Sequence, residues 1–265
     1  MKVFLLGGTK DSINLIKHIK ENYTSYILTT TTTEYGSKLA KEGGSDDTIA
    51  RPLLKEEIIE ILKEKKFDIL IDATHPFAEH ITQTSTSIAK ELKIPYIRFE
   101  RPTINFENIG TKNILPVNTF DDAGKLIEKK FKTGNVLHFA GANTMEHITK
   151  YVSVERFYPR ILKVPSSIEK CEKLGIDKNH IIPMTGAASC EENIELIEKY
   201  NASVMITKES GEIGGIIDKI DAANKKDISV IMIQRPVIKE LEKKDVITNL
   251  DEFDIKIKKI LNKNS

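Results

Sequence analysis

The segment KVFLLGGTKDSINLIKHIKEN, Lys2 to Asn22, joins an apolar run to a helical pattern through two glycines. The apolar run is short and continuous, which is typical of a strand buried in a parallel sheet. After the glycines, Ile13, Ile16 and Ile19 recur at the spacing of one helix face. A buried strand, a glycine turn and an amphipathic helix form the first unit of a parallel α/β sheet.

The same alternation continues to residue 99. Further strands are expected at 25–30, 48–50, 67–72 and 94–99, and helices at 34–44, 53–66 and 76–93. Pro76 would lie in the first turn of the last of these helices, where a missing N–H is tolerated. The alternation predicts a doubly wound parallel sheet.

The pattern changes at ERPTINFENIGTKN, residues 100–113, which lacks periodicity and is rich in polar and turn residues. We therefore expect an N-terminal dinucleotide-binding domain over 1–101 and a C-terminal α/β domain over 102–265. In the second domain, strands are expected at 135–141, 151–165, 203–211 and 228–236, and helices at 121–131, 191–200, 213–225 and 251–264.

The overall composition argues against several classes of protein. Forty basic and 39 acidic side chains among 265 residues give a net charge of +1, so no bulk charge attracts nucleic acid or a membrane surface. No apolar run approaches the ~18 residues of a spanning helix, and the two cysteines form no C-x-x-C pair. We expect a cytoplasmic monomer or small homo-oligomer that binds neither nucleic acid nor membranes.

Polar clusters follow the expected strands of the first domain, at the edge where open α/β sheets bind ligands. In GGTKDS, residues 7–12, the glycines let the backbone approach a pyrophosphate at a helix N-terminus, which favours anions. The motif is neither G-x-G-x-x-G nor a P-loop, and a tight strand-to-helix turn requires glycine in any case.

In TTTTTEYG, residues 29–36, hydroxyl side chains replace the acidic residue that grips the ribose of NAD in many dinucleotide sites. Hydroxyls suit a 2′-phosphate and favour NADPH, but no basic residue follows until Lys38. Threonine also suits a strand edge or a helix cap, so the choice between NADPH and NADH stays open.

The stretch FDILIDATHPFAEH, residues 67–80, ends a buried strand on Asp72, Thr74 and His75. Histidine titrates near neutrality, which makes His75 a candidate proton donor, with a hydrogen-bonded structural role as the alternative. The H-x-x-x-x-H spacing to His80 does not set both imidazoles on one helix face, so we expect no metal site.

Basic and small residues follow other strands. Arg98 and Arg101 lie where substrate carboxylates would bind, although surface arginines are common. In the second domain, the candidate anion-binding residues are Gly186, Ser189, Lys208 and Ser210. Helix capping explains the two serines equally well.

The chain resembles the precorrin-6A reductase family of corrin (vitamin B12) biosynthesis over nearly its whole length. The segments that carry the resemblance, in family order, are LLGGT at 5–9, IDATHPFA at 71–78, IPYIRFERP at 94–102, ITKESGEIGGIIDKIDAA at 206–223 and IQRP at 233–236. The lysine-rich, arginine-poor composition is similar to that of members from anaerobes, whose substrate already carries cobalt.

The resemblance implies an α/β protein of two Rossmann-like domains, with mainly parallel sheets and a cleft between them. It also implies an oxidoreductase that uses NADPH or NADH to reduce a double bond of a tetrapyrrole, converting (cobalt-)precorrin-6A to (cobalt-)precorrin-6B. Two other interpretations stay open, another NAD(P)-dependent reductase and a non-catalytic nucleotide- or tetrapyrrole-binding regulator. A short-chain dehydrogenase is disfavoured, because no tyrosine has a lysine four residues on.

Residue by residue, the resemblance implies that Gly7, Gly8 and Thr9 hold the pyrophosphate and that Thr30 and Thr31 lie by the adenosine ribose. Asp72 and His75 are the expected catalytic residues. The rest of the expected cofactor set is Lys10, Ala73 and Thr74, together with Asp72 and His75 themselves. The expected substrate set is Phe77, Arg98, Arg101, Gly186, Ser189, Lys208 and Ser210.

The chain departs from the family pattern at three places. Family members often carry an acidic residue and an arginine after GGT, where this chain has Lys10, Asp11 and Ser12. An aromatic residue common in the loop after Gly186 is replaced by alanine. An arginine that many members carry near the end of the second strand has no apparent counterpart.

Overall fold

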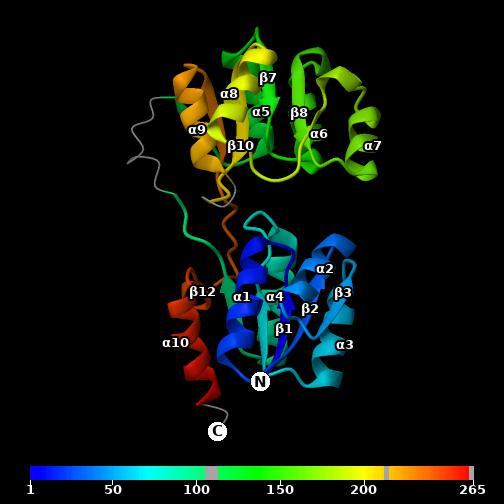
Figure 1. Ribbon diagram of the computed structural model, residues 1–265, viewed down its shortest axis with the longest axis vertical. Helices are drawn as coiled ribbons and strands as arrows, with labels where there is room; N and C mark the ends of the chain where they lie inside the picture. Colours follow the sequence, from blue (N-terminus) through cyan, green and yellow to red (C-terminus); the bar gives the residue numbers. More distant parts are fainter. Residues whose placement is uncertain (105–112, 212–214, 263–265) are drawn as a thin grey trace. The chain divides into compact units, whose positions relative to one another are not determined.

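The computed structural model describes residues 1–104, 113–211 and 215–262, and the chain divides into two compact units (Figure 1). The first unit comprises Met1–Pro102 and Pro236–Ser265, and the second comprises Thr103–Arg235. Each unit contains one six-stranded sheet in which every pairing is parallel. The expected α/β class with two Rossmann-like domains is confirmed.

The first unit follows the predicted strand–helix alternation. Its strands are β1 (Lys2–Leu6), β2 (Tyr26–Thr31), β3 (Asp47–Ala50), β4 (Ile69–Asp72), β5 (Tyr96–Phe99) and β12 (Val246–Ile247). Its helices are α1 (Lys10–Asn22), α2 (Glu34–Glu42), α3 (Lys55–Lys65), α4 (Glu79–Leu92) and α10 (Leu250–Leu261). The strand order is β12-β5-β4-β1-β2-β3, so the order reverses between β1 and β4.

Alternate side chains of β1 enter two separate cores, because successive side chains of a strand point to opposite faces of the sheet. Val3 and Leu5 pack in one core with residues of α1, α2 and α10. Phe4 and Leu6 pack in the other with residues of α3 and α4. Burial on both faces explains why the strand reads as a continuous apolar run.

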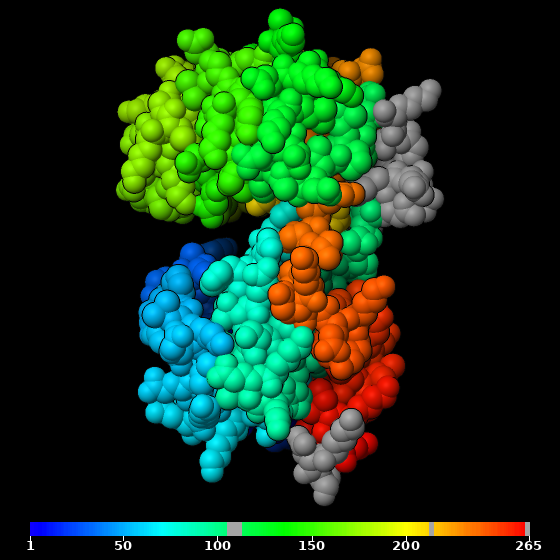
Figure 2. Space-filling view, turned by 180° about the vertical axis from the view of Figure 1, so that it is seen from behind, coloured from blue at the N-terminus to red at the C-terminus, as the bar shows by residue number. Residues whose placement is uncertain are grey.

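The C-terminal segment does not belong to the second unit, and the expected boundaries of 1–101 and 102–265 are wrong in this respect. Strand β12 pairs with β5, placing Ile247 opposite Phe99. Phe253 and Ile257 of α10 are fully buried in the core of the first unit. Figure 2 shows the red C-terminal residues on the same body as the blue and cyan N-terminal ones. The apolar stripe of α10 was readable in the sequence, but the sheet that it covers was not.

Helix α4 begins at Glu79, three residues later than expected. Pro76 lies instead in a turn in which the Ala78 N–H donates to the His75 carbonyl over 2.8 Å. Proline suits the second position of such a turn as well as a first helical turn, which is why the sequence did not distinguish them.

The second unit contains β6 (Ile114–Val117), β7 (Asn135–His138), β8 (Phe157–Ile161), β9 (Ile182–Pro183), β10 (Ala202–Lys208) and β11 (Ser229–Ile233). Its helices are α5 (Phe120–Lys130), α6 (Met145–Thr149), α7 (Pro165–Lys173), α8 (Cys190–Lys199) and α9 (Ile216–Lys225). The strand order β6-β11-β10-β7-β8-β9 reverses between β7 and β10. The strand expected over 151–165 is limited to β8, since a short 3-10 turn (Val154–Arg156) precedes it and α7 begins at Pro165.

Some expected elements fall partly outside the described residues. These are the domain-linking segment at 105–112, the first residues of the helix expected at 213–225 and the end of the helix expected at 251–264. Among the helices that the structure describes, none combines the length and the apolar character needed to cross a membrane.

Candidate active site

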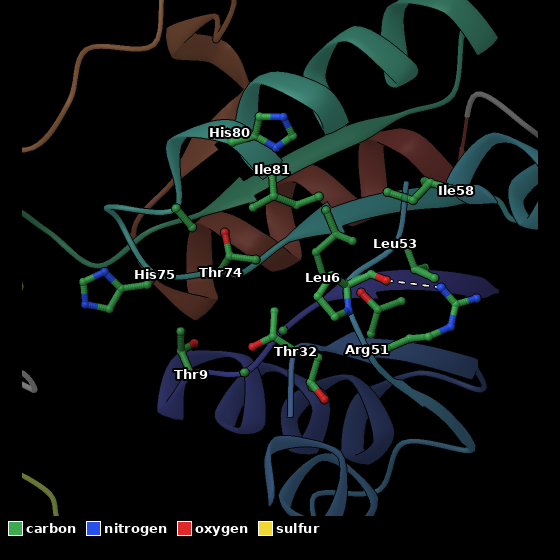
Figure 3. A pocket seen from close by; sticks show the side chains of 16 residues that line it. Leu6, Thr9, Thr32, Arg51, Leu53, Ile58, Thr74, His75, His80 and Ile81 are labelled. Carbon is green, nitrogen blue, oxygen red and sulfur yellow. Dashed lines mark hydrogen bonds between the residues drawn. The ribbon is translucent and has the colours of Figure 1, made fainter. Parts of the chain in front are cut away.

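A cavity of about 310 Å³ opens at the carboxyl ends of the first four strands, where the strand order of the first unit reverses. Figure 3 shows Thr9, Thr74 and His75 at one end of it and Arg51, Leu53 and Ile58 at the other. The cavity is lined by Leu6, Gly7, Gly8, Thr9, Thr30, Thr31, Thr32, Arg51, Pro52, Leu53, Ile58, Thr74, His75, Ala78, His80 and Ile81.

The turn after β1 offers a backbone surface to this cavity. Gly8 has φ of 103°, and a Cβ placed on it would meet no atom within 4 Å. A Cβ on Gly7 would lie 3.0 Å from Thr29 Cγ2, so this position is closed by packing rather than open to a ligand. The open space at Gly8, at the N-terminus of α1, fits a pyrophosphate that approaches the backbone closely.

The side chains of this turn are engaged in local structure. Thr9 caps α1 by accepting from the Ser12 N–H over 3.0 Å, and its hydroxyl donates to the Ala73 carbonyl over 2.9 Å. The Gly8 and Thr9 amides both donate to Ser12 Oγ, at 3.2 and 3.1 Å. Thr9 therefore ties the β1–α1 turn to the loop after β4, and a ligand there meets an ordered turn.

Two expected ligand contacts of this region are directed elsewhere. Lys10 is exposed and does not line the cavity. Arg101, expected to meet substrate carboxylates, donates through Nε to Asp11 Oδ2 over 2.7 Å, and both side chains are about nine-tenths buried. Asp11, one of the departures from the family pattern, is thus the partner of Arg101.

Asp72 and Arg98 form a buried pair, and neither lines the cavity, so their expected ligand contacts stay a prediction. Both side chains are fully buried, and Arg98 Nη1 lies 2.7 Å from Asp72 Oδ1. Asp72 Oδ1 also accepts from the backbone N–H and the hydroxyl of Thr74, at 3.0 and 2.6 Å, and Oδ2 accepts from Thr82. Strand β4 ends on an aspartate because this carboxylate fixes the following loop to β5 and α4.

Arg98 extends the same network toward His75. Its Nε lies 3.0 Å from Glu100 Oε2, and its Nη groups donate to Thr74 Oγ1 and to the His75 carbonyl, at 3.0 and 3.4 Å. Burial lowers the pKa of Arg98, but the charges of Asp72 and Glu100 raise it more, so the pKa stays above its usual value. The pair therefore positions Thr74 and His75 without reaching the cavity.

Thr74 and His75 line one end of the cavity. The Phe77 N–H donates to His75 Nδ1 over 3.2 Å. Since Nδ1 accepts this bond, the neutral imidazole carries its hydrogen on Nε2, which can donate it. Ala73 is buried and contributes its carbonyl to Thr9, and Phe77 is half-buried with its ring 5.9 Å from that of His75.

The other end of the cavity combines hydroxyl, apolar and basic groups. Thr30 and Thr31 line it as expected, and Thr31 Oγ1 donates to the Thr33 carbonyl over 2.9 Å. Arg51, which the sequence reasoning missed, follows β3 and also lines the cavity. Ala50 pairs with Thr31 in register, which was the signal that Arg51 lies beside the end of β2.

In the second unit, the expected residues lie at the end of β10 and before α8. Lys208 is the last residue of β10 and Ser210 follows it, at the reversal of strand order. Burial lowers the pKa of Lys208 to about 8. Gly186 has φ of 86° and open space at its Cβ position. Ser189 caps α8, since its Oγ accepts from the Glu192 N–H over 3.2 Å. The capping interpretation of Ser189 thus accounts for its hydroxyl.

Two further basic residues of this unit were not anticipated. Arg160 of β8 stacks over the Phe139 ring at 4.3 Å, and burial lowers its pKa to about 10. Lys219 of α9 is buried, and burial together with the charge of Arg160 lowers its pKa to about 7. Buried cations with mutual repulsion, near the carboxyl ends of strands, are typical of a region that receives anions.

Comparison with known proteins identifies the family of the chain. Residues 2–254 match the model of the family described as "Precorrin-6x reductase CbiJ/CobK". The chain belongs to this family. A cobalt-precorrin-6A reductase of Methanocaldococcus jannaschii is 37% identical over 99% of both chains, and one of Methanothermobacter thermautotrophicus is 36% identical over 98% of this chain and 85% of its own.

The fold of the family is also the fold observed here. A solved structure of the CobK precorrin-6A reductase has a TM-score of 0.76 and covers 98% of this chain and 97% of its own, at 15% identity. At that identity the likeness shows the fold alone. Family membership supports the expected reductase over the regulator and over an unrelated dehydrogenase.

Proposed function

We propose that the chain reduces cobalt-precorrin-6A, using a nicotinamide dinucleotide held in the cavity of the first unit. The observation that carries this proposal is that cavity, which lies at the reversal of strand order and joins an open glycine turn to Thr74 and His75. Family membership supplies the reaction class, an oxidoreductase acting on a CH–CH group. The six relatives of 26 to 38% identity that carry the cobalt-precorrin name favour the cobalt-containing substrate.

The lining suits an extended dinucleotide. The open backbone at Gly8 and the N-terminus of α1 would receive the pyrophosphate. Leu53 and Ile58 offer apolar surface for an adenine, and Thr30 and Thr31 offer hydroxyls near its ribose. The nicotinamide, which supplies a hydride when bound, then belongs at the end formed by Thr74 and His75.

His75 is the proposed source of the proton. Reduction of a double bond adds a hydride to one atom and a proton to its neighbour. His75 would supply the proton from Nε2, which carries the hydrogen of the neutral imidazole because Nδ1 accepts from the Phe77 N–H. The buried pair Asp72 and Arg98 holds the backbone carbonyl of His75 and the hydroxyl of Thr74. Asp72 is therefore a positioning residue rather than a proton donor.

The second unit would hold the acidic arms of the tetrapyrrole. Lys208, Arg160 and Lys219 lie in a low-dielectric environment, where a carboxylate gains more from a cation than it does in water. Gly186 and Ser210 would add backbone and hydroxyl contacts. This set would let a chain of nearly zero net charge bind a polyanion.

The test is an anaerobic assay with purified protein, cobalt-precorrin-6A and either NADPH or NADH, followed by dinucleotide absorbance and product mass. We expect dinucleotide oxidation only in the presence of the tetrapyrrole, and a product heavier by two hydrogens. Metal-free precorrin-6A, assayed in parallel, should react more slowly. Tight dinucleotide binding without any reduction of either tetrapyrrole would contradict the proposal and favour a regulator.

A further inference from the structure

We propose that Glu209 is a positioning residue of the substrate site in the second unit. It holds Lys208 and Ser210 in place by binding the two segments through which the chain passes between the units. The inference rests on the proposed function, because it requires these two residues to bind the acidic arms of the tetrapyrrole. It also gives a role to the IQRP segment at 233–236, which the proposed function does not use.

Glu209 lies in an unfavourable place for an acidic side chain. Strand β10 ends at Lys208, and Glu209 and Ser210 follow where the strand order reverses. The Glu209 side chain is only 5% exposed, and a buried carboxylate is costly unless it is paired and hydrogen-bonded. A carboxylate between two ligands of a polyanion also repels that polyanion. Its contacts show what it does there.

The first set of contacts joins Glu209 to the segment after β11. Arg235 Nε forms an ion pair with Glu209 Oε2, and Arg235 Nη2 donates to Oε1 over 3.4 Å. Arg235 Nε also donates to the Glu209 carbonyl over 3.4 Å, and the Glu209 N–H donates to the Ile233 carbonyl over 2.9 Å. Both the backbone and the side chain of Glu209 are thus bound to the segment that enters the first unit at Pro236.

The second set of contacts joins the same carboxylate to the other connecting segment. The Ile104 N–H donates to Glu209 Oε1 over 3.4 Å, two residues after Pro102, at which the chain leaves the first unit. The Gly211 N–H donates to the same oxygen over 3.2 Å, and Gly211 has φ of 70°, which glycine adopts without strain. One carboxylate therefore binds both connecting segments and closes the turn that carries Ser210.

Position and charge make opposite predictions for this residue. Glu209 is adjacent in sequence to Lys208 and Ser210, so fixing its backbone and carboxylate fixes where both neighbours begin. If the charge of Glu209 mattered most, its removal would strengthen the binding of a polyanion. If its contacts position the neighbours, its removal would weaken binding, because a misplaced group loses much of its interaction.

The experiment is steady-state kinetics with cobalt-precorrin-6A at saturating dinucleotide, on Glu209→Ala, Glu209→Asp and Glu209→Gln. Aspartate keeps the charge but is shorter by one methylene, whereas glutamine keeps the length and an acceptor oxygen but loses the charge. The matched control is Arg156→Met. Arg156 precedes β8 at the opposite edge of the same sheet and donates to the carbonyls of Phe131 and Lys132. Urea denaturation measures the stability of each variant.

We expect Glu209→Ala to raise the KM for the tetrapyrrole by about 10- to 100-fold and to change kcat by less than about twofold, the pattern of a lost binding interaction. Glu209→Asp should raise KM by about 3- to 10-fold, and Glu209→Gln by less than about threefold. The Kd for the dinucleotide should stay unchanged, because its cavity lies in the first unit. Arg156→Met should lose stability and keep its KM. If Glu209→Ala does not fold, the comparison of aspartate with glutamine carries the test.

Several results would overturn the positioning role. They are a KM that is unchanged or lowered in Glu209→Ala or Glu209→Asp, a larger rise in Glu209→Gln than in Glu209→Asp, and an equal rise in Arg156→Met. In each case the reductase assignment stands, provided that the wild-type protein reduces the tetrapyrrole. If the wild-type protein neither binds nor reduces cobalt-precorrin-6A, the proposed function fails, and the role of Glu209 fails with it.

Discussion

Two of the arginine–carboxylate pairs of the first unit have nearly equal contact distances and very different burial. Arg98 and Asp72 are 2.7 Å apart with both side chains fully buried, and Arg51 and Glu57 are 2.6 Å apart with both side chains partly exposed. The buried pair also bonds the loop that carries Thr74 and His75, while Asp72 Oδ2 accepts from Thr82 of α4 and Arg98 Nε donates to Glu100. Contact distance alone does not reveal the role of a pair, whereas burial and the number of other partners do.

Breaking the buried pair should have the largest effect. Arg98→Met leaves Asp72 charged, buried and without its cation, and the free energy of unfolding should fall by about 3 to 5 kcal/mol in urea denaturation. The matched change Arg51→Met should leave the urea midpoint unchanged. Equal destabilisation by the two variants would contradict the distinction between the pairs.

Changing the group that the buried pair positions should impair chemistry and leave the fold intact. His75→Gln keeps a polar side chain but removes the acid, so kcat with cobalt-precorrin-6A should fall by about 100- to 10,000-fold. The Kd for the dinucleotide should change little, as measured by titration. Near-normal turnover would show that a carboxylic arm of the substrate or a water donates the proton.

A buried lysine of the second unit, Lys219, should make the free energy of unfolding depend on pH. Lys219 has a folded-state pKa lowered to about 7, whereas lysine in an unfolded chain titrates near its ordinary value of 10.5. Between these values the unfolded chain binds more protons, so stability should rise with pH from about 7 toward 10, by at most about 1.4 kcal/mol per pH unit. Lys219→Met should flatten this rise in urea denaturation at several pH values. An unchanged slope would show that Lys219 stays protonated in the folded protein.

The smallest effect is expected at an exposed cap. Ser189→Ala removes the acceptor for the Glu192 N–H and should cost about 1 kcal/mol of stability. The KM for the tetrapyrrole should be unchanged, because the hydroxyl serves α8. A raised KM in Ser189→Ala, with kcat and stability unaltered, would restore Ser189 to the substrate set.

Much of the first unit could be predicted from local patterns. The strands, the glycine turn and the polar end of β4 have short-range signals, so Gly8, Thr30, Thr74 and His75 were correctly expected at one edge. Which groups pair across the sheet has no local signal. Arg98 and Arg101 therefore looked like substrate ligands, although their partners Asp72 and Asp11 lie far away in the sequence.

Residues brought in by sheet register were missed for the same reason. Arg51 lies about 20 residues after β2 and reaches its neighbour Thr32 only through the pairing of β2 with β3. The placement of α10 on the first unit depends on a two-residue strand, which is too short to be recognised in the sequence. Residues at the ends of strands could be predicted from local sequence. The pairing of strands and side chains that lie far apart in the sequence could not.

The most direct test of the account is a crystal structure of the chain with NADP⁺. The account predicts the pyrophosphate against Gly8 and the start of α1, the nicotinamide beside Thr74 and His75, and the adenosine beside Leu53 and Ile58. A dinucleotide bound in the opposite direction, or anywhere outside this cavity, would contradict the assignment of His75.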